Sequence, residues 1–359
     1  MYLQLKPRCI TATTEHSHAR QSLSRDLHEQ LIESNLDNFD WIHGGQTGPI
    51  KFIDIHQLEF ATSRALKGSL VATLMVNLNL EGIKHLIIPE HGGACQYATG
   101  ARWNNRNQLT TLAGQAIVLQ ALALGAGLRR RISDFELGRG ISVFVAMNAQ
   151  EIGLLPSSGY AGDSDAPLGA RLRDNAWYAT ALHLFANSYR SADLSSVADQ
   201  LFASIVTNHL NGSTSCVDKV FGRSKFKLDQ IVAVASALTH FGKINGKQQL
   251  LNQAKTLICT FVPRYHCIGG GYAQACFQQA DCGAEIDIDC TIDLVRTCLS
   301  LLRAMPSRRL WSIVQHGVCG LFNPAIALAR RPETGILLVA GELAELSTRR
   351  TTSKFAASV

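Results

Sequence analysis

The chain has 359 residues, of which 46% are hydrophobic and 17% charged, and its net charge is +6. This composition indicates a globular protein with a large buried core. The positive charge comes from arginine pairs near expected helix ends, without interleaved aromatic residues, so nucleic-acid binding is not expected. The most apolar run, residues 116–128, is clearly shorter than the roughly twenty residues of a membrane span. We therefore expect no membrane insertion and a cytoplasmic location.

The N-terminal segment, residues 1–39, is predicted to be a poorly ordered leader. Its first twenty residues lack the charged-then-apolar layout of a secretion signal, and His16 and His18 lie among polar residues. One domain is expected over residues 40–340, followed by a flexible tail over 341–359.

Helical spacing of apolar residues dominates the rest of the chain, and strand-like alternation is rare. Helices are predicted at 56–67, 69–82, 107–128, 133–149, 174–190, 193–210, 226–241, 245–263, 286–303, 308–318 and 324–331. They fall into pairs, whose first members recur about every fifty to sixty-five residues. Glycine-rich loops separate the pairs. A repeat of this kind predicts an all-α toroid of helical hairpins, written (α/α).

Polar residues stand at or just before the first helix of several pairs. In a closed toroid the equivalent helix ends meet at one rim, so these side chains are expected to ring one mouth of a funnel. The alternative, helix N-capping, also favours Asp and Asn at such positions. The residues concerned are Asn104, Asn107, Asp163, Asp165, Asp174, Asn175, Asp229, Gln230, Asp287 and Asp289.

Ten cysteines are present, but none forms a Cys-x-x-Cys pair and no histidine pattern completes a zinc site. Several lie in apolar runs and are expected to be buried thiols, with a disulfide among residues 267–290 left open. No metal and no cofactor are predicted.

Residues 44–52 read Gly-Gly-Gln-Thr-Gly-Pro-Ile-Lys-Phe, residues 92–103 read Gly-Gly-Ala-Cys-Gln-Tyr-Ala-Thr-Gly-Ala-Arg-Trp, and residues 158–165 read Ser-Gly-Tyr-Ala-Gly-Asp-Ser-Asp. These three segments resemble motifs of the spermatogenesis-associated, thioredoxin-domain-bearing family. Residues 44–52 are similar to its Gly-Gly-Phe-Gly-x-x-Pro-Lys-Phe, and residues 92–103 to its Gly-Gly-Phe-x-Arg-Tyr-x-x-Asp-x-x-Trp. Residues 158–165 resemble Gly-Phe-Tyr-Ser-x-x-Asp-Ala-Asp, and shorter matches follow at 174–176, 228–230 and 270–272. The resemblance implies a helical domain related to six-hairpin glycosidases and sugar epimerases.

The chain also departs from that family. The thioredoxin-like domain and its Cys-x-x-Cys have no counterpart before residue 40. Where the family has His, Glu, Lys and Asp in one motif, this chain has Asn107, Leu109, Thr110 and Gly114. On a helix from 107, residues 107, 110 and 114 would share the face toward the funnel, and they cannot transfer protons.

Three functions are therefore weighed. The first is a carbohydrate- or polyol-binding pseudo-enzyme with little turnover. The second is a protein-interaction scaffold for a thioredoxin-like partner, and the third is an active carbohydrate hydrolase or epimerase that uses relocated carboxylates, with Asp163, Asp165 and Asp174 as the main candidates. The expected ligand-binding residues are Tyr97, Trp103, Asn107, Tyr160, Asn175, Asp229 and Asp287, and Trp177 and Tyr178 are further stacking aromatics.

Overall fold

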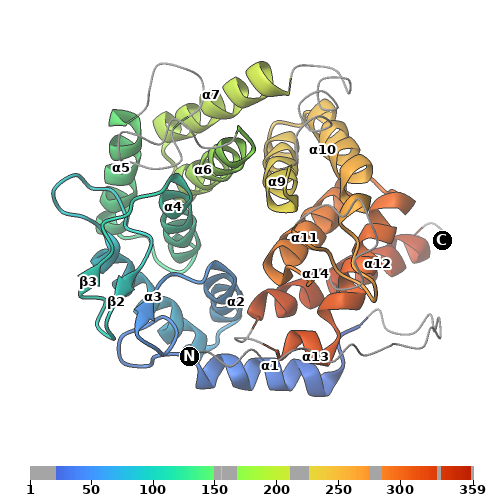
Figure 1. Cartoon of the computed structure of the whole chain (residues 1–359), viewed down its shortest axis with the longest axis horizontal. Helices are drawn as coiled ribbons and strands as arrows, with labels where there is room; N and C mark the ends of the chain where they lie inside the picture. Colours follow the sequence, from blue (N-terminus) through green and yellow to red (C-terminus); the bar gives the residue numbers. More distant parts are fainter. Residues whose placement is uncertain are drawn as a thin grey trace, which may run out of the picture.

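Two concentric rings of helices build the structure (Figure 1). The computed structural model describes residues 22–148, 155, 168–210, 226–274, 285–329 and 333–356. The inner ring consists of α2 (Ile55–Ala65), α4 (Leu112–Ala126), α6 (Leu168–Tyr189), α9 (Leu228–Ile244), α11 (Ile288–Ala304) and α14 (Thr334–Ala356). Each of these helices contacts the next, and α14 contacts α2, so the inner ring is closed.

The outer ring follows from the hairpin repeat. Five outer helices each follow an inner helix in the chain and pack against it: α3 (Leu70–Leu86), α5 (Ile132–Met147), α7 (Ala192–His209), α10 (Gln248–Phe261) and α12 (Arg308–Leu321). The sixth outer position belongs to α1 (Arg25–Asp37), which packs against α14. The last hairpin therefore joins the two ends of the described chain. Two short elements, η1 (Val262–Tyr265) and α13 (Pro324–Ala327), lie in the C-terminal half. The chain has the (α/α) toroid fold predicted from the helix pairs.

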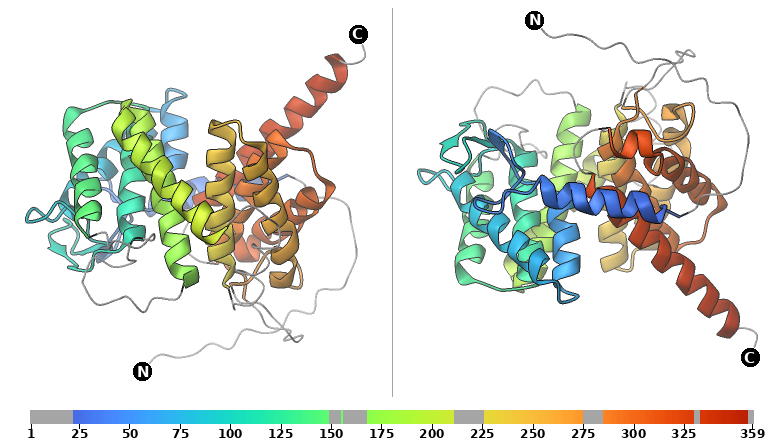
Figure 2. Two further views of the ribbon diagram at one scale, coloured as in Figure 1. Left: turned by 90° about the horizontal axis from the view of Figure 1, so that it is seen from above. Right: turned by 90° about the horizontal axis from the view of Figure 1, so that it is seen from below.

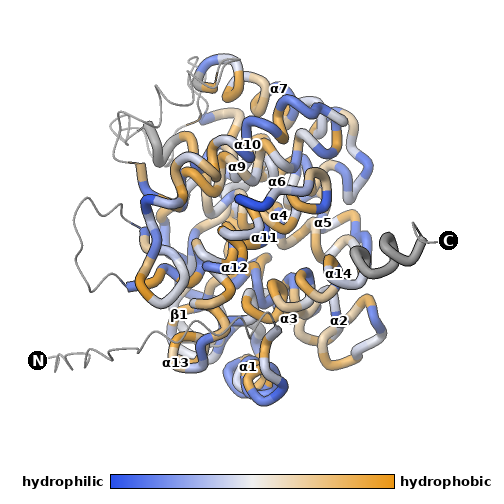
Figure 3. The backbone as a smooth tube through the Cα atoms, turned by 90° about the vertical axis from the view of Figure 1, so that its right-hand side faces the viewer, coloured by the Kyte–Doolittle hydropathy of each residue, from blue (hydrophilic) through white to orange (hydrophobic). Residues whose placement is uncertain are grey.

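Local sequence signals explain where helices begin. Asp54, Ser69, Thr111 and Asp287 each stand at an N-cap, where the side-chain oxygen accepts the backbone N–H three residues on. Such caps satisfy donors that the helix itself cannot. Hydrophobic and hydrophilic residues are both present along the helices (Figure 3), as expected for amphipathic helices that pack one face against a core.

The hydrophobic core has two parts. One cluster spans α2 to α5, and the other spans α9 to α14 together with Leu27 and Leu31 of α1. Helix α6 contributes to both: Leu172 and Ala176 to the C-terminal cluster, Leu182 to the N-terminal one. The two halves of the ring are thus joined by apolar packing at α6.

A small antiparallel sheet, which the sequence reading did not predict, lies outside the N-terminal half. Strands β1 (Ile50–Lys51), β2 (Ala98–Thr99) and β3 (Asn105–Arg106) pair in that order. Strands of only two residues are too short to show an alternating pattern in the sequence.

Within the described residues, helices lie in parts of both the expected leader and the expected tail. Helix α1 lies inside the expected leader, and its Leu27, Leu31 and Asn35, four residues apart, are buried. Helix α14 continues through the expected tail, with Leu343 and Leu346 buried, and its C-terminal part extends beyond the ring (Figure 2). Charged residues in α1 and the glycines of α14 weaken the helical signal, but packing of one against the other outweighs it.

The cysteines that the structure describes are all free, and most are buried. Cys276 and Cys282 fall outside the described residues, so the disulfide expectation is retained only for pairs involving them. Among the helices described here, none has the length and apolar character that a membrane span requires.

Candidate functional site

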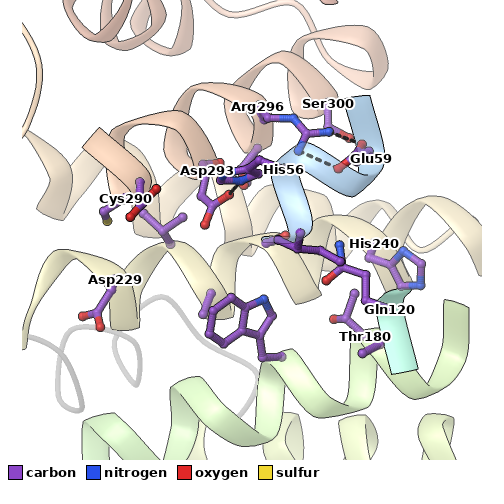
Figure 4. A pocket seen from close by; sticks show the side chains of 18 of the residues that line it. His56, Glu59, Gln120, Thr180, Asp229, His240, Cys290, Asp293, Arg296 and Ser300 are labelled. Carbon is purple, nitrogen blue, oxygen red and sulfur yellow. Dashed lines mark hydrogen bonds and ion pairs between the residues drawn. The ribbon is translucent and has the colours of Figure 1, made fainter. Parts of the chain in front are cut away.

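A cavity of about 820 Å³ occupies the centre of the inner ring. All six inner helices contribute to its wall. Among the side chains that line it are His56, Glu59, Gln120, Arg173, Trp177, Asp229, His240, Lys243, Asp287, Asp289, Asp293, Arg296 and Glu342. Figure 4 shows several of these side chains directed into a shared space.

Of the polar residues predicted at helix starts, Asp229, Asp287 and Asp289 line the cavity, and Asp54, which was not predicted, lies with them. Asp54 and Asp287 are the N-caps of α2 and α11, and Asp229 and Asp289 lie in the first turns of α9 and α11. All four line the cavity. The capping interpretation holds as well, because Asp54 accepts the N–H of Gln57 and Asp287 that of Cys290.

His56 and Asp293 form the first polar pair of the wall. The Nε2 atom of His56, on α2, lies 3.1 Å from Oδ1 of Asp293, on α11. Burial alone would lower the pKa of His56, but the hydrogen bond and charge of Asp293, helped by Asp54, raise it to about 9. His56 is therefore a protonated acid at neutral pH.

Asp289 lies one helical turn before Asp293 and is exposed to the cavity solvent. Protein nevertheless surrounds it, and this burial, together with the charges of Asp293, Asp287 and Asp54, raises the pKa of its carboxyl, although nearby His56 opposes the shift. This carboxyl therefore binds a proton more readily than an ordinary aspartate does.

Arg296 carries a second set of ion pairs one turn further along α11. Its guanidinium binds both carboxylate oxygens of Glu59, on α2, and its Nε donates to Glu342, on α14, at 2.8 Å. Although burial opposes it, the charges of both carboxylates raise the pKa of Arg296 further above its already high value. This planar fork fixes three inner helices relative to one another.

His240, on α9, pairs with His183 of α6 at a ring-nitrogen distance of 3.0 Å. Burial and the neighbouring His183 and Lys243 lower the pKa of His240 to about 4, so it is neutral at pH 7. The pKa of His183 is also lowered, chiefly by burial. The cavity wall therefore holds one protonated and one neutral imidazole.

Arg173 binds two carboxylates at the rim. It donates to Asp174 and to Asp229, each at 2.7 Å, and joins α6 to α9. Asp174 is 3% exposed and lies behind Arg173, outside the cavity lining. Asp174 therefore orients a rim arginine from outside the wall.

Of the other residues singled out in the sequence, Trp177 lines the cavity with Asp229 and Asp287. Asn175 is fully buried and holds the backbone of Leu155 through two hydrogen bonds of 2.9 Å. Tyr178 is buried, and Tyr97 is outside the lining. Asp163, Asp165 and Tyr160 fall outside the described residues.

Trp103 lies in the core of the N-terminal half, away from the cavity. It is 1% exposed, and its indole N–H donates to the carbonyl of His43 at 2.9 Å. Gly45 and Gly82 make room for the ring, since a Cβ on either would lie 2.8 Å from it. Trp103 is therefore a packing residue, which corrects its prediction as a ligand-binding residue of the funnel.

The predicted polar face at 107, 110 and 114 does not exist, because α4 begins at Leu112. Asn107 precedes the helix and accepts the N–H of Leu109, while Thr110 is buried. A side chain at Gly114 would meet Thr111 and Gln96. Gln120 is the residue of α4 that lines the cavity. The replaced residues of the family motif therefore lie away from this cavity.

Sequence reasoning missed His56, His240, Asp293 and Arg296 because it considered helix starts and not helix faces. A signal existed: His56 and Glu59, like Asp293 and Arg296, are three residues apart in predicted inner helices. Such spacing puts both side chains of each pair on one face. In the part of the chain that is described, no three His, Cys, Asp or Glu side chains are grouped as metal ligands.

Comparisons with known proteins find similarity in structure. No protein-family model matches the sequence, and no curated protein matches it. A D-mannose isomerase has 13% identity and a TM-score of 0.64, over 90% of this chain and 98% of that one. A cellobiose 2-epimerase from Bacillus thermoamylovorans B4167 has 9% identity and a TM-score of 0.66, over 83% of this chain and 85% of that one. A GH76 α-mannanase from Bacteroides thetaiotaomicron has 10% identity and a TM-score of 0.64, over 90% and 96%. The chain shares the six-hairpin glycosidase-like toroid of these structures.

Proposed function

We propose that the chain binds a carbohydrate or a related polyol in the central cavity. The observation that carries this proposal is the cavity itself: about 820 Å³, enclosed by six helices, with an indole in a wall of carboxylates, amides and hydroxyls. Small-molecule sites have volumes of this order. Trp177 offers an apolar face for a sugar ring, and side chains such as Asp229 and Gln120 offer acceptors and donors for its hydroxyls.

The likeness of the fold to a sugar isomerase, an epimerase and a mannanase supports the same ligand class. Relationship to the thioredoxin-domain-bearing family remains a hypothesis that rests on the sequence motifs. The scaffold alternative, with a thioredoxin-like partner, predicts that the side chains of the inner helices fill the ring. The open cavity argues against this alternative.

Binding is tested by isothermal titration and thermal shift against a panel of neutral mono- and disaccharides, since a ligand that binds the native state raises the melting temperature. We expect binding that Trp177→Ala weakens at least about fivefold, because stacked aromatic contacts contribute about 1 kcal/mol or more. Trp41→Ala is the matched control, since Trp41 is 39% exposed and lies outside the cavity lining. A sugar that binds equally well to both variants would place the site elsewhere.

The second candidate function is acid–base conversion of the bound sugar, such as epimerisation or hydrolysis. The specific observation in its favour is the opposite protonation of His56 and His240 in one cavity, beside the carboxyl of Asp289 with its raised pKa. Groups whose surroundings push their pKa values apart can serve as acid and base. The loss of the family's His-Glu-Lys-Asp set does not count against this candidate, because those positions lie away from the cavity.

Turnover is tested by incubating sugars that bind with the protein in D₂O. Proton NMR would show deuterium entering the carbon beside a carbonyl, a new epimer, or a released sugar. We expect His56→Gln and Asp289→Asn to abolish any such signal while sugar binding is retained. Conversion that persists in both variants would rule out these groups as the acid and base.

A further inference from the structure

One junction of the inner ring is held by polar contacts. The buried residues of α2, such as Leu58 and Ala61, belong to the N-terminal hydrophobic cluster, and those of α11 and α14 belong to the C-terminal one. The half-buried Phe60 supplies apolar contact across this junction. A buried hydrogen bond of 2.8 Å from Gln57 of α2 to Asn35 of α1 adds to it. The position of α2 relative to α11 therefore depends strongly on polar links.

Two such links run side by side from α2 to α11, with α14 standing between these helices in the ring. His56 contacts Asp293, and Glu59 contacts Arg296 through both of its carboxylate oxygens. The partners in each helix are three residues apart, so the two links are about one turn from each other. Arg296 also binds Glu342, which ties α14 into the same arrangement.

The two links differ in strength. His56 has one contact to α11. Its imidazole also lies close to α14, since a Cβ on Gly335 would be 3.0 Å from Nδ1. Arg296 has three hydrogen bonds to two helices, and its side chain is 20% exposed. A bidentate guanidinium–carboxylate pair fixes both distance and orientation. The stronger link is thus placed to set the geometry of the weaker one.

From this arrangement we infer that Arg296, with Glu59 and Glu342, is a positioning residue that holds His56 in contact with Asp293. The inference deepens the proposed function, because His56 is the acidic group that the cavity presents to its ligand. Arg296 acts through the placement of α2 and needs no contact with the ligand.

Charge and position have opposite effects on His56, which makes the inference testable. The charged groups that face His56 are Asp289, Asp293 and Arg296 of α11 and Asp54 at the start of its own helix. The positive charge of Arg296 lowers the pKa of His56. If charge were its only effect, Arg296→Gln would raise that pKa above about 9. If Arg296 holds His56 against Asp293, the same variant loses the hydrogen bond, and the pKa falls toward the ordinary value of about 6.5.

The experiment is an NMR titration of the histidine side chains in the full-length protein, with the His56 signal assigned by its disappearance in His56→Gln. We expect Arg296→Gln to lower the pKa of His56 by about one unit or more. Arg303→Gln is the matched control: Arg303 lies on the same helix, but it forms its ion pairs with Glu342 at 3.9 Å and Glu345 at 3.4 Å, both on α14. It should leave the pKa unchanged.

A pKa of His56 that stays the same or rises in Arg296→Gln would overturn the inference. Should that variant fail to fold, Arg296→Lys is titrated in its place, because it keeps the positive charge but loses the bidentate pair with Glu59. A fall in the pKa of His56 then supports the inference, and an unchanged pKa overturns it. The titration needs no ligand, so it separates this inference from the proposed function. If the pKa of His56 falls but no sugar binds, the positioning role of Arg296 is supported and the carbohydrate proposal is rejected. If a sugar binds but the pKa of His56 rises, the carbohydrate proposal is supported and the positioning role is rejected.

Discussion

Lys51 offers the sharpest test of how this toroid is stabilised. Its side chain is fully buried, and the ammonium has three acceptors: Oδ2 of Asp40 at 2.6 Å, the carbonyl of Gln46 at 2.8 Å and that of Gly44 at 3.2 Å. Lys51→Met would fill much of the same space but leave Asp40 without its cation and two carbonyls without a donor. Removal of one partner from a buried ion pair costs about 3 to 5 kcal/mol. We expect the free energy of unfolding to fall by this amount.

The measurement is urea denaturation followed by circular dichroism at pH 7. In the double variant Lys51→Met/Asp40→Asn the uncompensated charge is gone, while Oδ1 can still accept the N–H groups of Ile42 and His43. We expect it to regain about 1 to 3 kcal/mol of the loss. Lys67→Met, at an exposed position, should change the stability by less than about 0.5 kcal/mol.

Acid dependence provides an independent check on the same pair. Burial alone would raise the pKa of Asp40, but its bonds to Lys51, His43 and Ile42 lower it below the usual value. A depressed carboxyl pKa adds stability above the unfolded-state value near 4, and this contribution is lost as the pH falls through the folded-state value. The loss should be smaller in Lys51→Met. If that variant loses less than about 1 kcal/mol and keeps the acid dependence of the unaltered protein, the account of a paired buried lysine is wrong.

Three further predictions concern other parts of the molecule. The pKa of His56 is about 9 against an ordinary value of 6.5, which adds up to about 3 kcal/mol of stability. This stability is complete below about pH 6.5 and is lost as the pH rises through about 9, and urea denaturation at both limits should show the loss. In Asp293→Asn most of this pH dependence should be absent. Gly138→Ala should lower the stability by about 1 to 3 kcal/mol, because the new Cβ would lie 2.2 Å from the ring of Phe185; a melting temperature equal to that of the unaltered protein would show that the ring moves freely. Among the cysteines that the structure describes, the exposed Cys319 should react first with a thiol reagent, and earlier modification of a buried thiol would contradict the packing seen here.

The repeat of helical hairpins could be predicted from the sequence because apolar spacing and glycine loops recur together. The predicted starts of α2, α3 and α12 lie within one residue of those observed. The start of α4 was placed too early because Asn107 and Thr110 fit a helical pattern. The N–H of Leu109 is instead bound by the side chain of Asn107, and Thr111 caps the helix. Local side-chain bonds of this kind compete with the helix and are hard to detect without coordinates.

The candidate site could be predicted only at its rim. Asp229 and Asp287 line the cavity, as expected from their places at helix starts. The contact of His56 with Asp293 joins residues 237 positions apart, and no local pattern reports such a distance. Predicting this contact requires knowing which face of each inner helix points inward. The orientation of these faces is set by closure of the ring, which depends on all the hairpins together.

The pairing of α1 with α14 affects the order in which the chain can become folded during synthesis. Helix α1 leaves the ribosome before the other helices described here, and it packs against α14, which leaves after them. Until α14 is complete, Leu27 and Leu31 lack the partners that bury them, and the inner ring has an open end at α2. Contacts between distant parts of a chain are slow to form, and exposed apolar surface promotes aggregation while they are missing. Nascent chains should therefore depend on chaperones until α14 has left the ribosome, and a permuted chain in which α14 leads directly into α1 should depend on them less.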